Sequence, residues 1–228
     1  MVNAGKPGRP RAGEERLSRQ TILEAALRIV DDEGIEAMTM RRLAATLGVN
    51  PMSIYHHLPN KAAVFAGLAE LVFAQLESSA PDDSVPWQDE LKGAATAYRD
   101  ALRAHPNLAL QVLSDTSAVS DVVVVTVEPF YRALDRAGAT PRQIFEAVNT
   151  IVDFIHGFSL GEASVRADTF DLAPDLLTRI GNLPLGKAPT LVRIVTELGA
   201  EGLAYDFDSG FVTGISLVVD GIEARFGL

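Results

Sequence analysis

The side chains best suited to contact another molecule lie within residues 51–58. Four of them can donate hydrogen bonds to DNA phosphates or base edges: Ser53, Tyr55, His56 and His57. Met52 adds an apolar side chain that can contact a thymine methyl group. Ile54 and Leu58 are four residues apart, so on a helix they face inward and hold it on a scaffold. This composition indicates a helix that contacts DNA, although a solvated helix with two surface histidines would show the same pattern.

The residues around this segment predict two short helices joined by a tight turn. Leu43, Ala44 and Leu47 have helical spacing, and Gly48 can adopt the positive φ that ends a helix. Asn50 is a favourable N-cap and Pro51 suits the first helical position, so a second helix, MSIYHHL, starts at once and ends before Pro59. Two helices with such a turn are typical of a helix-turn-helix, whose second helix enters the major groove.

A third helix completes an N-terminal head. Ser18 caps a helix to about Glu33 that Gly34 ends, with an apolar stripe of Ile22, Ala25, Ala26, Ile29 and Val30. Asn60 caps a long helix that connects the head to the rest of the chain. We expect a disordered arm at 1–16, with basic residues that could track phosphates, a helix-turn-helix domain at 17–62 and a helical body at 63–228. A loose tail without function is the alternative for the arm.

Composition and charge restrict the class of protein. The chain has 228 residues, no cysteine and no run of ~18 apolar residues, and its start has no secretory signal, so we expect a cytoplasmic protein. The net charge of −10 is uneven, at +2 over residues 1–61 and −12 over residues 62–228. An acidic protein can still bind DNA if its cations gather on one face.

The body is predicted to be helical throughout. Helices are expected from Trp87 to Ala104, from Thr140 to about Arg166, from Pro189 to Gly199 and from Asp208 to Phe226. The second of these starts at a capping box, Thr140-Pro141-Arg142-Gln143. Glycines recur on two of these late helices, at 157, 161, 210, 214 and 221, where a missing Cβ lets helices approach closely. The approach could be within one subunit or between two subunits in a four-helix interface.

Two patterns resemble a catalytic site and a metal site, but the surrounding sequence supports neither. Gly157-Phe158-Ser159-Leu160-Gly161 matches the G-x-S-x-G hydrolase motif, but that motif needs a strand before the serine, and here the pattern is helical. The histidines have no metal-ligand spacing with a nearby carboxylate, and no glycine-rich phosphate loop is present. We therefore expect no enzyme activity, no cofactor and no metal site.

A small-molecule site is a further possibility. Asn149, Asp153 and His156 form a polar stripe on an otherwise apolar helix, and Tyr98, Gln111 and Asp115 could face the same interior. Buried polar groups need partners, which a ligand can supply. A solvated helix edge or a subunit contact explains the stripe equally well.

Taken together, these residues resemble the TetR family of transcriptional regulators. The resemblance covers nearly the whole chain and is most specific over residues 18–68, where Gly34, Thr39, Arg41, Leu47-Gly48-Val49, Tyr55 and Asn60-Lys61 fall in order. It implies an all-α homodimer that binds a palindromic operator and is released by a small effector. The residues that it implies as DNA contacts are Thr39, Arg41, Pro51, Met52, Ser53, Tyr55, His56, His57 and Lys61.

The body is similar to the tetracycline-repressor branch, with two departures. Val112 stands where that branch has its magnesium-binding histidine, and Glu77 and Ala94 replace a drug-contacting histidine and asparagine, so tetracycline-magnesium is not the expected effector. The positions left for a pocket are Tyr98, Asp115, Phe145, Val148, Asn149 and Val152. The competing hypothesis is a helical ligand-binding protein or enzyme whose head no longer functions. The sequence specifies neither the effector nor the sign of regulation.

Overall fold

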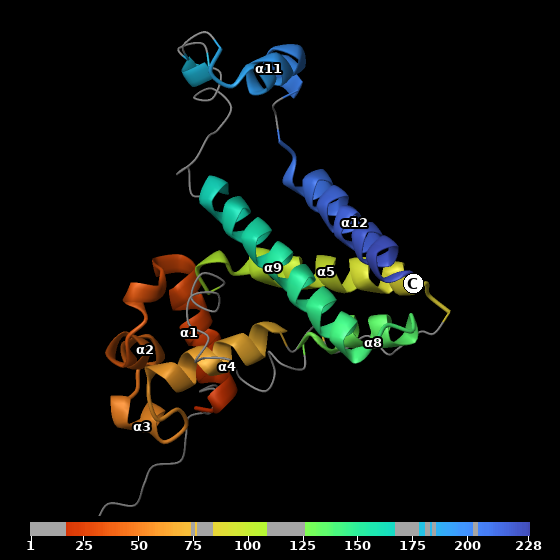
Figure 1. Cartoon of the computed structure of the whole chain (residues 1–228). Helices are drawn as coiled ribbons and strands as arrows, with labels where there is room; N and C mark the ends of the chain where they lie inside the picture. Colours follow the sequence, from red (N-terminus) through yellow and green to blue (C-terminus); the bar gives the residue numbers. More distant parts are fainter. Residues whose placement is uncertain are drawn as a thin grey trace, which may run out of the picture.

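The computed structural model of this chain describes residues 17–73, 76, 84–108, 126–166, 178–180, 183, 186–202 and 205–228. All regular structure in these residues is helical, which confirms the all-α prediction. The predicted arm at 1–16 and the positions Glu77, Val112 and Asp115 lie outside the described residues. Figure 1 shows the N-terminal helices as one group beside a larger group formed by the later helices.

The head consists of α1 (Arg19–Glu33), the short 3-10 helix η1 (Ile35–Ala37), α2 (Met40–Leu47) and α3 (Pro51–Tyr55). The predicted caps are present: Ser18 Oγ accepts a hydrogen bond from the Thr21 N–H, and the Asn50 side chain accepts one from the Met52 N–H. Gly48 is left-handed, with φ 65° and ψ 27°, and turns the chain between α2 and α3.

The second helix of the pair is shorter than predicted. It ends at Tyr55, and the N–H groups of His57 and Leu58 both donate to the Ile54 carbonyl in the turn that follows. Pro59 contributes to the early end, because it has no N–H to donate to the Tyr55 carbonyl four residues earlier. The inward positions are as expected, since Ile54 and Leu58 are both buried.

The body surrounds one central helix. α4 (Lys61–Phe73) leads out of the head, and α5 (Trp87–Ala104) packs against α8 (Glu128–Arg136), α9 (Pro141–Arg166) and α12 (Phe207–Phe226). α9 and α12 run side by side across α5 in Figure 1, and α11 (Pro189–Gly202) lies beyond their ends. α9 starts at the predicted capping box, where the Thr140 N–H donates to Gln143 Oε1 over 2.9 Å.

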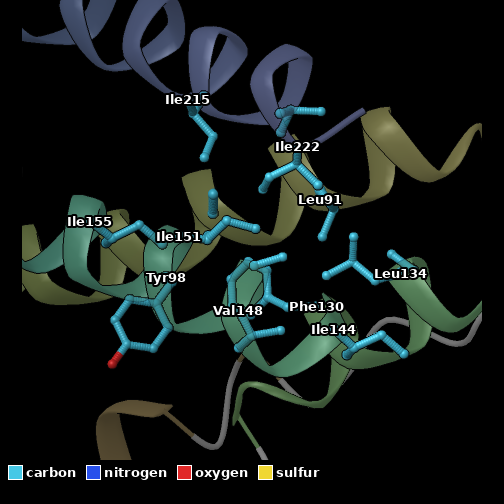
Figure 2. Close-up of a cluster of buried hydrophobic side chains, with 14 of the residues drawn as sticks. Leu91, Tyr98, Phe130, Leu134, Ile144, Val148, Ile151, Ile155, Ile215 and Ile222 are labelled. Carbon is cyan, nitrogen blue, oxygen red and sulfur yellow. The ribbon is translucent and has the colours of Figure 1, made fainter. Parts of the chain in front are cut away.

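Buried apolar side chains form two cores that meet at α4. The head core holds Leu43, Ile54 and Leu68, whereas the body core holds Phe73 and Phe130. Figure 2 shows the body core, with side chains from α5, α8, α9 and α12 meeting between the helices. α4 contributes to both cores and therefore joins head and body mechanically. Within the described residues, no helix is long and apolar enough to span a bilayer.

Candidate nucleic-acid interface and ligand cavities

The predicted DNA contacts all lie on the outside of the head. Met52 is 62% exposed and Tyr55 41% exposed, although both are large side chains that a monomeric head could have buried. Between them on α3, Ile54 points into the core. The remaining predicted contacts are exposed or half-buried: Thr39, Arg41, Pro51, Ser53, His56, His57 and Lys61. α3 is therefore held by its inner face and presents its outer face to a partner.

Two adjacent arginines at the start of α2 differ in whether their guanidinium groups already have a partner within the protein. The Arg42 guanidinium donates to Glu33, with Nη2 2.5 Å from Oε1 and Nε 3.2 Å from Oε2. The hydrogen bond and the charge of Glu33 raise the pKa of Arg42 above its ordinary value. Within the part of the chain that the structure describes, the Arg41 guanidinium has no hydrogen-bond or ion-pair partner, and Arg41 is exposed. Arg41 is thus the cation of α2 that remains available to a phosphate or a base.

Thr39 and Lys61 stand at the starts of α2 and α4. Thr39 Oγ1 caps α2 by accepting the Arg42 N–H over 3.1 Å, which leaves its own O–H free to donate. Lys61 Nζ lies 5.4 Å from the centroid of the Phe65 ring. Both positions bring a donor to a helix start, where backbone N–H groups also favour an anion.

The predicted ligand residues of the body are not gathered in one place. Tyr98 and Val148 are buried in the body core (Figure 2). Val152 is half-buried against that core. Phe145 is 54% exposed, and the exposed Asn149 donates its amide to the Phe145 carbonyl over 2.7 Å. The structure therefore brings Tyr98 and Val148 together and separates Phe145 and Asn149 from them.

The predicted polar stripe on α9 is divided in the same way. Asp153 is exposed like Asn149, but His156 turns inward and its Nε2 lies 3.0 Å from the Tyr98 hydroxyl. Burial raises the pKa of Tyr98 to about 12. Burial also lowers the pKa of His156, which the charge of Asp153 only partly offsets. Both shifts favour the neutral forms of the two groups, and the tautomer of His156 decides whether its Nε2 or the Tyr98 hydroxyl is the donor.

Two cavities flank α5, and of the effector-site positions discussed from the sequence only Ala94, which replaces a drug-contacting residue of the tetracycline-repressor branch, lies on a described wall. The α5–α8 cavity, of about 250 Å³, is lined by Ala94, Glu90 and Arg132 among others. The junction cavity, of about 510 Å³, lies between α1, α4 and α5, and Leu76 and Ala97 line both cavities. No predicted ligand residue that the structure describes lies on either wall. The available signal was a row of alanines with helical spacing on α5: Ala94, Ala97, Ala101 and Ala104.

The serine of the G-x-S-x-G pattern lies in the middle of α9. Ser159 is buried, and the residues on both sides of it are helical, so no strand-to-helix elbow presents its hydroxyl. No cluster of three or more potential metal ligands occurs among the described residues. The described geometry thus offers a contact surface and two cavities.

Comparisons with known proteins agree with this geometry. Residues 22–68 match the family of bacterial regulatory proteins designated tetR, and residues 80–226 match the tetracyclin repressor-like C-terminal domain. The chain is 29% identical to the class C tetracycline repressor of Escherichia coli over 209 residues, which cover 91% of each protein.

Solved structures extend the likeness to three dimensions. The regulator SCO7222 of Streptomyces coelicolor, described as a TetR, superimposes with a TM-score of 0.78 at 28% identity, over 92% of this chain and all of that one. A structure of BioQ with its double-stranded DNA operator gives a TM-score of 0.63 at 26% identity, over 92% of this chain and 99% of that one.

Proposed function

Because this chain belongs to the TetR family and is a ligand-responsive DNA-binding regulator, we propose that it is a repressor released from a palindromic operator by a small molecule. The observation that carries the proposal is the outer face of α2 and α3, where Arg41, Met52 and Tyr55 are exposed beside a fully buried head core. The relatives are regulators, so we infer regulation and no catalysis. A DNA-binding bacterial regulator works in the cytoplasm, where the DNA is.

The chemistry of the side chains in the head suggests which of them contact bases and which contact phosphates. Arg41, Pro51, Met52, Ser53, Tyr55 and His56 would approach base edges. Thr39, His57 and Lys61 would contact phosphates, together with the hydroxyl groups of Ser53 and Tyr55. The early end of α3 supports this assignment, because the turn after Tyr55 leaves His56 and His57 exposed. The head at 17–62 would be the DNA-binding domain and the rest of the chain the effector-binding and dimerisation domain.

The exposed face of α9 and α12 is the proposed dimer interface. A Cβ added at Gly157, Gly161 or Gly221 would meet none of the described residues within 4 Å, whereas Gly214 is packed against the Phe154 ring. Large apolar side chains are exposed on the same two helices: Phe145, Leu160, Val212 and Leu217. A second copy would bury these side chains and use the open glycines for close approach. Two-fold symmetry then places two heads on a palindrome.

The effector is proposed to bind in the body beside α5. Both cavities lie along this helix, and the α5–α8 cavity contains Ala94 at a position where tetracycline repressors contact their drug. Tyr98, Val148 and Val152 form the adjoining core, whereas Phe145 and Asn149 would reach an effector only from the exposed side of α9. Asp115 remains a proposed contact.

An effector acts by its differential affinity for the DNA-competent state and a second state whose heads are wrongly spaced.

The deciding experiment is binding of the purified protein to the DNA upstream of its own gene. We expect specific binding that weakens steeply with salt, and its loss in the double variant Arg41→Ala/Tyr55→Ala. The matched control is Arg142→Ala/Tyr205→Ala, which removes one exposed arginine and one exposed tyrosine from the body. Selection from a random DNA library covers an operator elsewhere in the genome. Failure to select any sequence, or equal loss in the control, would refute the proposal.

A further inference from the structure

The junction cavity lies where the head meets the body. Its walls come from Leu27 of α1, Leu71 and Val72 of α4, and Ala101 and Ala104 of α5. Its volume of about 510 Å³ falls within the roughly 300–1,000 Å³ that small-molecule sites occupy. These walls are aliphatic, so the cavity suits the apolar part of a ligand.

The walls belong to both cores of the molecule. Leu27 packs against the head core, and Ala101 packs against the head core and the body core. A molecule in this cavity therefore touches head and body at once. Its contacts depend on where the head lies relative to α5.

The polar residues of the junction cavity leave one carboxylate unpaired. Asp100 lines the cavity and is exposed, and it has no hydrogen-bond or ion-pair partner among the residues described. His105 also lines the cavity, but its Nδ1 is 2.9 Å from Asp31 Oδ2 and so already has a partner. Among the described residues, the uncompensated charge at the rim is therefore negative and favours a cationic group.

We propose that the junction cavity binds an amphipathic primary amine, with the apolar chain between α1, α4 and α5 and the ammonium group at Asp100. The ammonium has three donors, which the carboxylate and water can satisfy at the exposed rim. The chain gains free energy by leaving water for aliphatic walls. This site is separate from the α5–α8 cavity, although Leu76 and Ala97 lie between the two.

Hydrogen bonds at one end of the cavity tie the head to the body. Besides the His105–Asp31 contact, Asn107 Nδ2 donates to the Val30 carbonyl over 2.9 Å, and Leu108 is buried in the head core. These contacts fix the end of α1 on the residues that follow α5. An amine that fits the cavity better in one head position would increase the population of that position and so change the affinity for DNA. DNA would in turn change the affinity for the amine by the same factor. This coupling rests on the proposed function, whereas amine binding does not.

Isothermal titration calorimetry of the full chain with three ten-carbon probes, below micelle formation, tests the site. We expect decylammonium to bind tightest, decanol about two- to fivefold more weakly, and decanoate most weakly, because Asp100 repels it. In Asp100→Asn the difference between decylammonium and decanol should disappear. Decanoate binding as tightly as decylammonium would refute the chemistry of the site.

A matched pair of variants locates the site. Ala101→Phe fills the junction cavity and Ala94→Phe fills the α5–α8 cavity, and both alanines are half-buried on the same helix. We expect decylammonium affinity to fall at least about tenfold in Ala101→Phe and to stay within about twofold of wild type in Ala94→Phe. Ala104→Phe, on the exposed wall, replaces Ala101→Phe if that variant unfolds. The opposite ranking, or no effect in either, would overturn the proposal.

A second titration tests the coupling to the head. The selected DNA should change the affinity of the wild type for decylammonium by a certain factor. Decylammonium should change the affinity for that DNA by the same factor. If the amine binds but DNA affinity stays constant, the cavity is a ligand site and the coupling is wrong. If no DNA is selected at all, the proposed function fails while the amine titrations still decide the site.

Discussion

The head and the body use their arginines in opposite ways. In the head, Arg41 is exposed without a partner in the described chain, and Arg42 has only the exposed Glu33 and Thr46. In the body, Arg99 is 3% exposed, with Nη2 2.9 Å from Glu162 Oε2 and 2.9 Å from Asp208 Oδ1. Exposed cations exchange water for phosphate at little cost, whereas a buried cation is available to nothing outside the molecule.

The buried network of the body joins three helices. Arg99 lies on α5, Glu162 on α9 and Asp208 on α12, and the Arg99 guanidinium stands 4.9 Å from the Phe211 ring centroid. The hydrogen bond from Arg99, with the charges of Arg103 and Arg99, lowers the pKa of Asp208. The difference between head and body teaches that charge here stabilises the body and equips the head for contact. Four measurements test this difference between head and body.

Arg99→Ala should show the largest effect. Removing the guanidinium takes the closest cation away from the buried Glu162, whose other oxygen lies 3.4 Å from Arg103 Nε, so the free energy of unfolding should fall by about 3–5 kcal/mol, measured by denaturant titration. Arg99→Met/Glu162→Met, which replaces both charges with apolar side chains, should recover most of the loss. A single variant within about 1 kcal/mol of wild type would mean that the pair does not stabilise the body.

Arg41→Ala and Arg42→Ala compare the two head arginines directly. We expect Arg41→Ala to weaken DNA binding by about 1–3 kcal/mol and to leave the free energy of unfolding unchanged. Arg42→Ala should cost less DNA affinity, because Glu33 already neutralises that guanidinium. Fluorescence anisotropy with the selected DNA measures both. Equal losses would show that the Glu33 contact opens on DNA.

Glu33→Gln should have a smaller effect, in the favourable direction. Loss of the carboxylate frees Arg42 for phosphate, so DNA affinity should rise by less than about 1 kcal/mol, and the salt dependence should steepen by about one counterion. Glu36→Gln is the matched control, because Glu36 is exposed on η1. An equal gain in both variants would indicate a general charge effect.

His156 should give the body a weak pH dependence. Its pKa is lowered by burial in the folded chain, so below about pH 6.5 the unfolded chain takes up the proton first and the free energy of unfolding falls. Above that pH the contribution of His156 to the free energy of unfolding is fully present. His156→Gln should remove this part of the slope, seen by thermal unfolding from about pH 7 to 5. Parallel curves for the two proteins would rule out the contribution.

Local sequence was sufficient for the ends of the helices. Ser18, Asn50 and Thr140 cap helices as predicted, and Gly48 makes the predicted turn. A cap satisfies N–H groups two or three residues away, so its partner is known from the sequence alone. The inward positions of α3 also follow from the sequence, because residues with helical spacing lie on the same face. The one error there is a helix carried past Tyr55, where the missing N–H of Pro59 leaves the Tyr55 carbonyl without its helical donor.

Tertiary structure alone decided which side chains became partners. Arg99 and Glu162 are 63 residues apart, Tyr98 and His156 are 58 apart, and Asp100 and Leu27 share a cavity from two different helices. The sequence by itself determined an all-helical chain with a DNA-contacting head. It could not determine the cavities or the buried charges, because helical spacing defines which residues share a face, and only the packing of helices distant in sequence decides what that face meets.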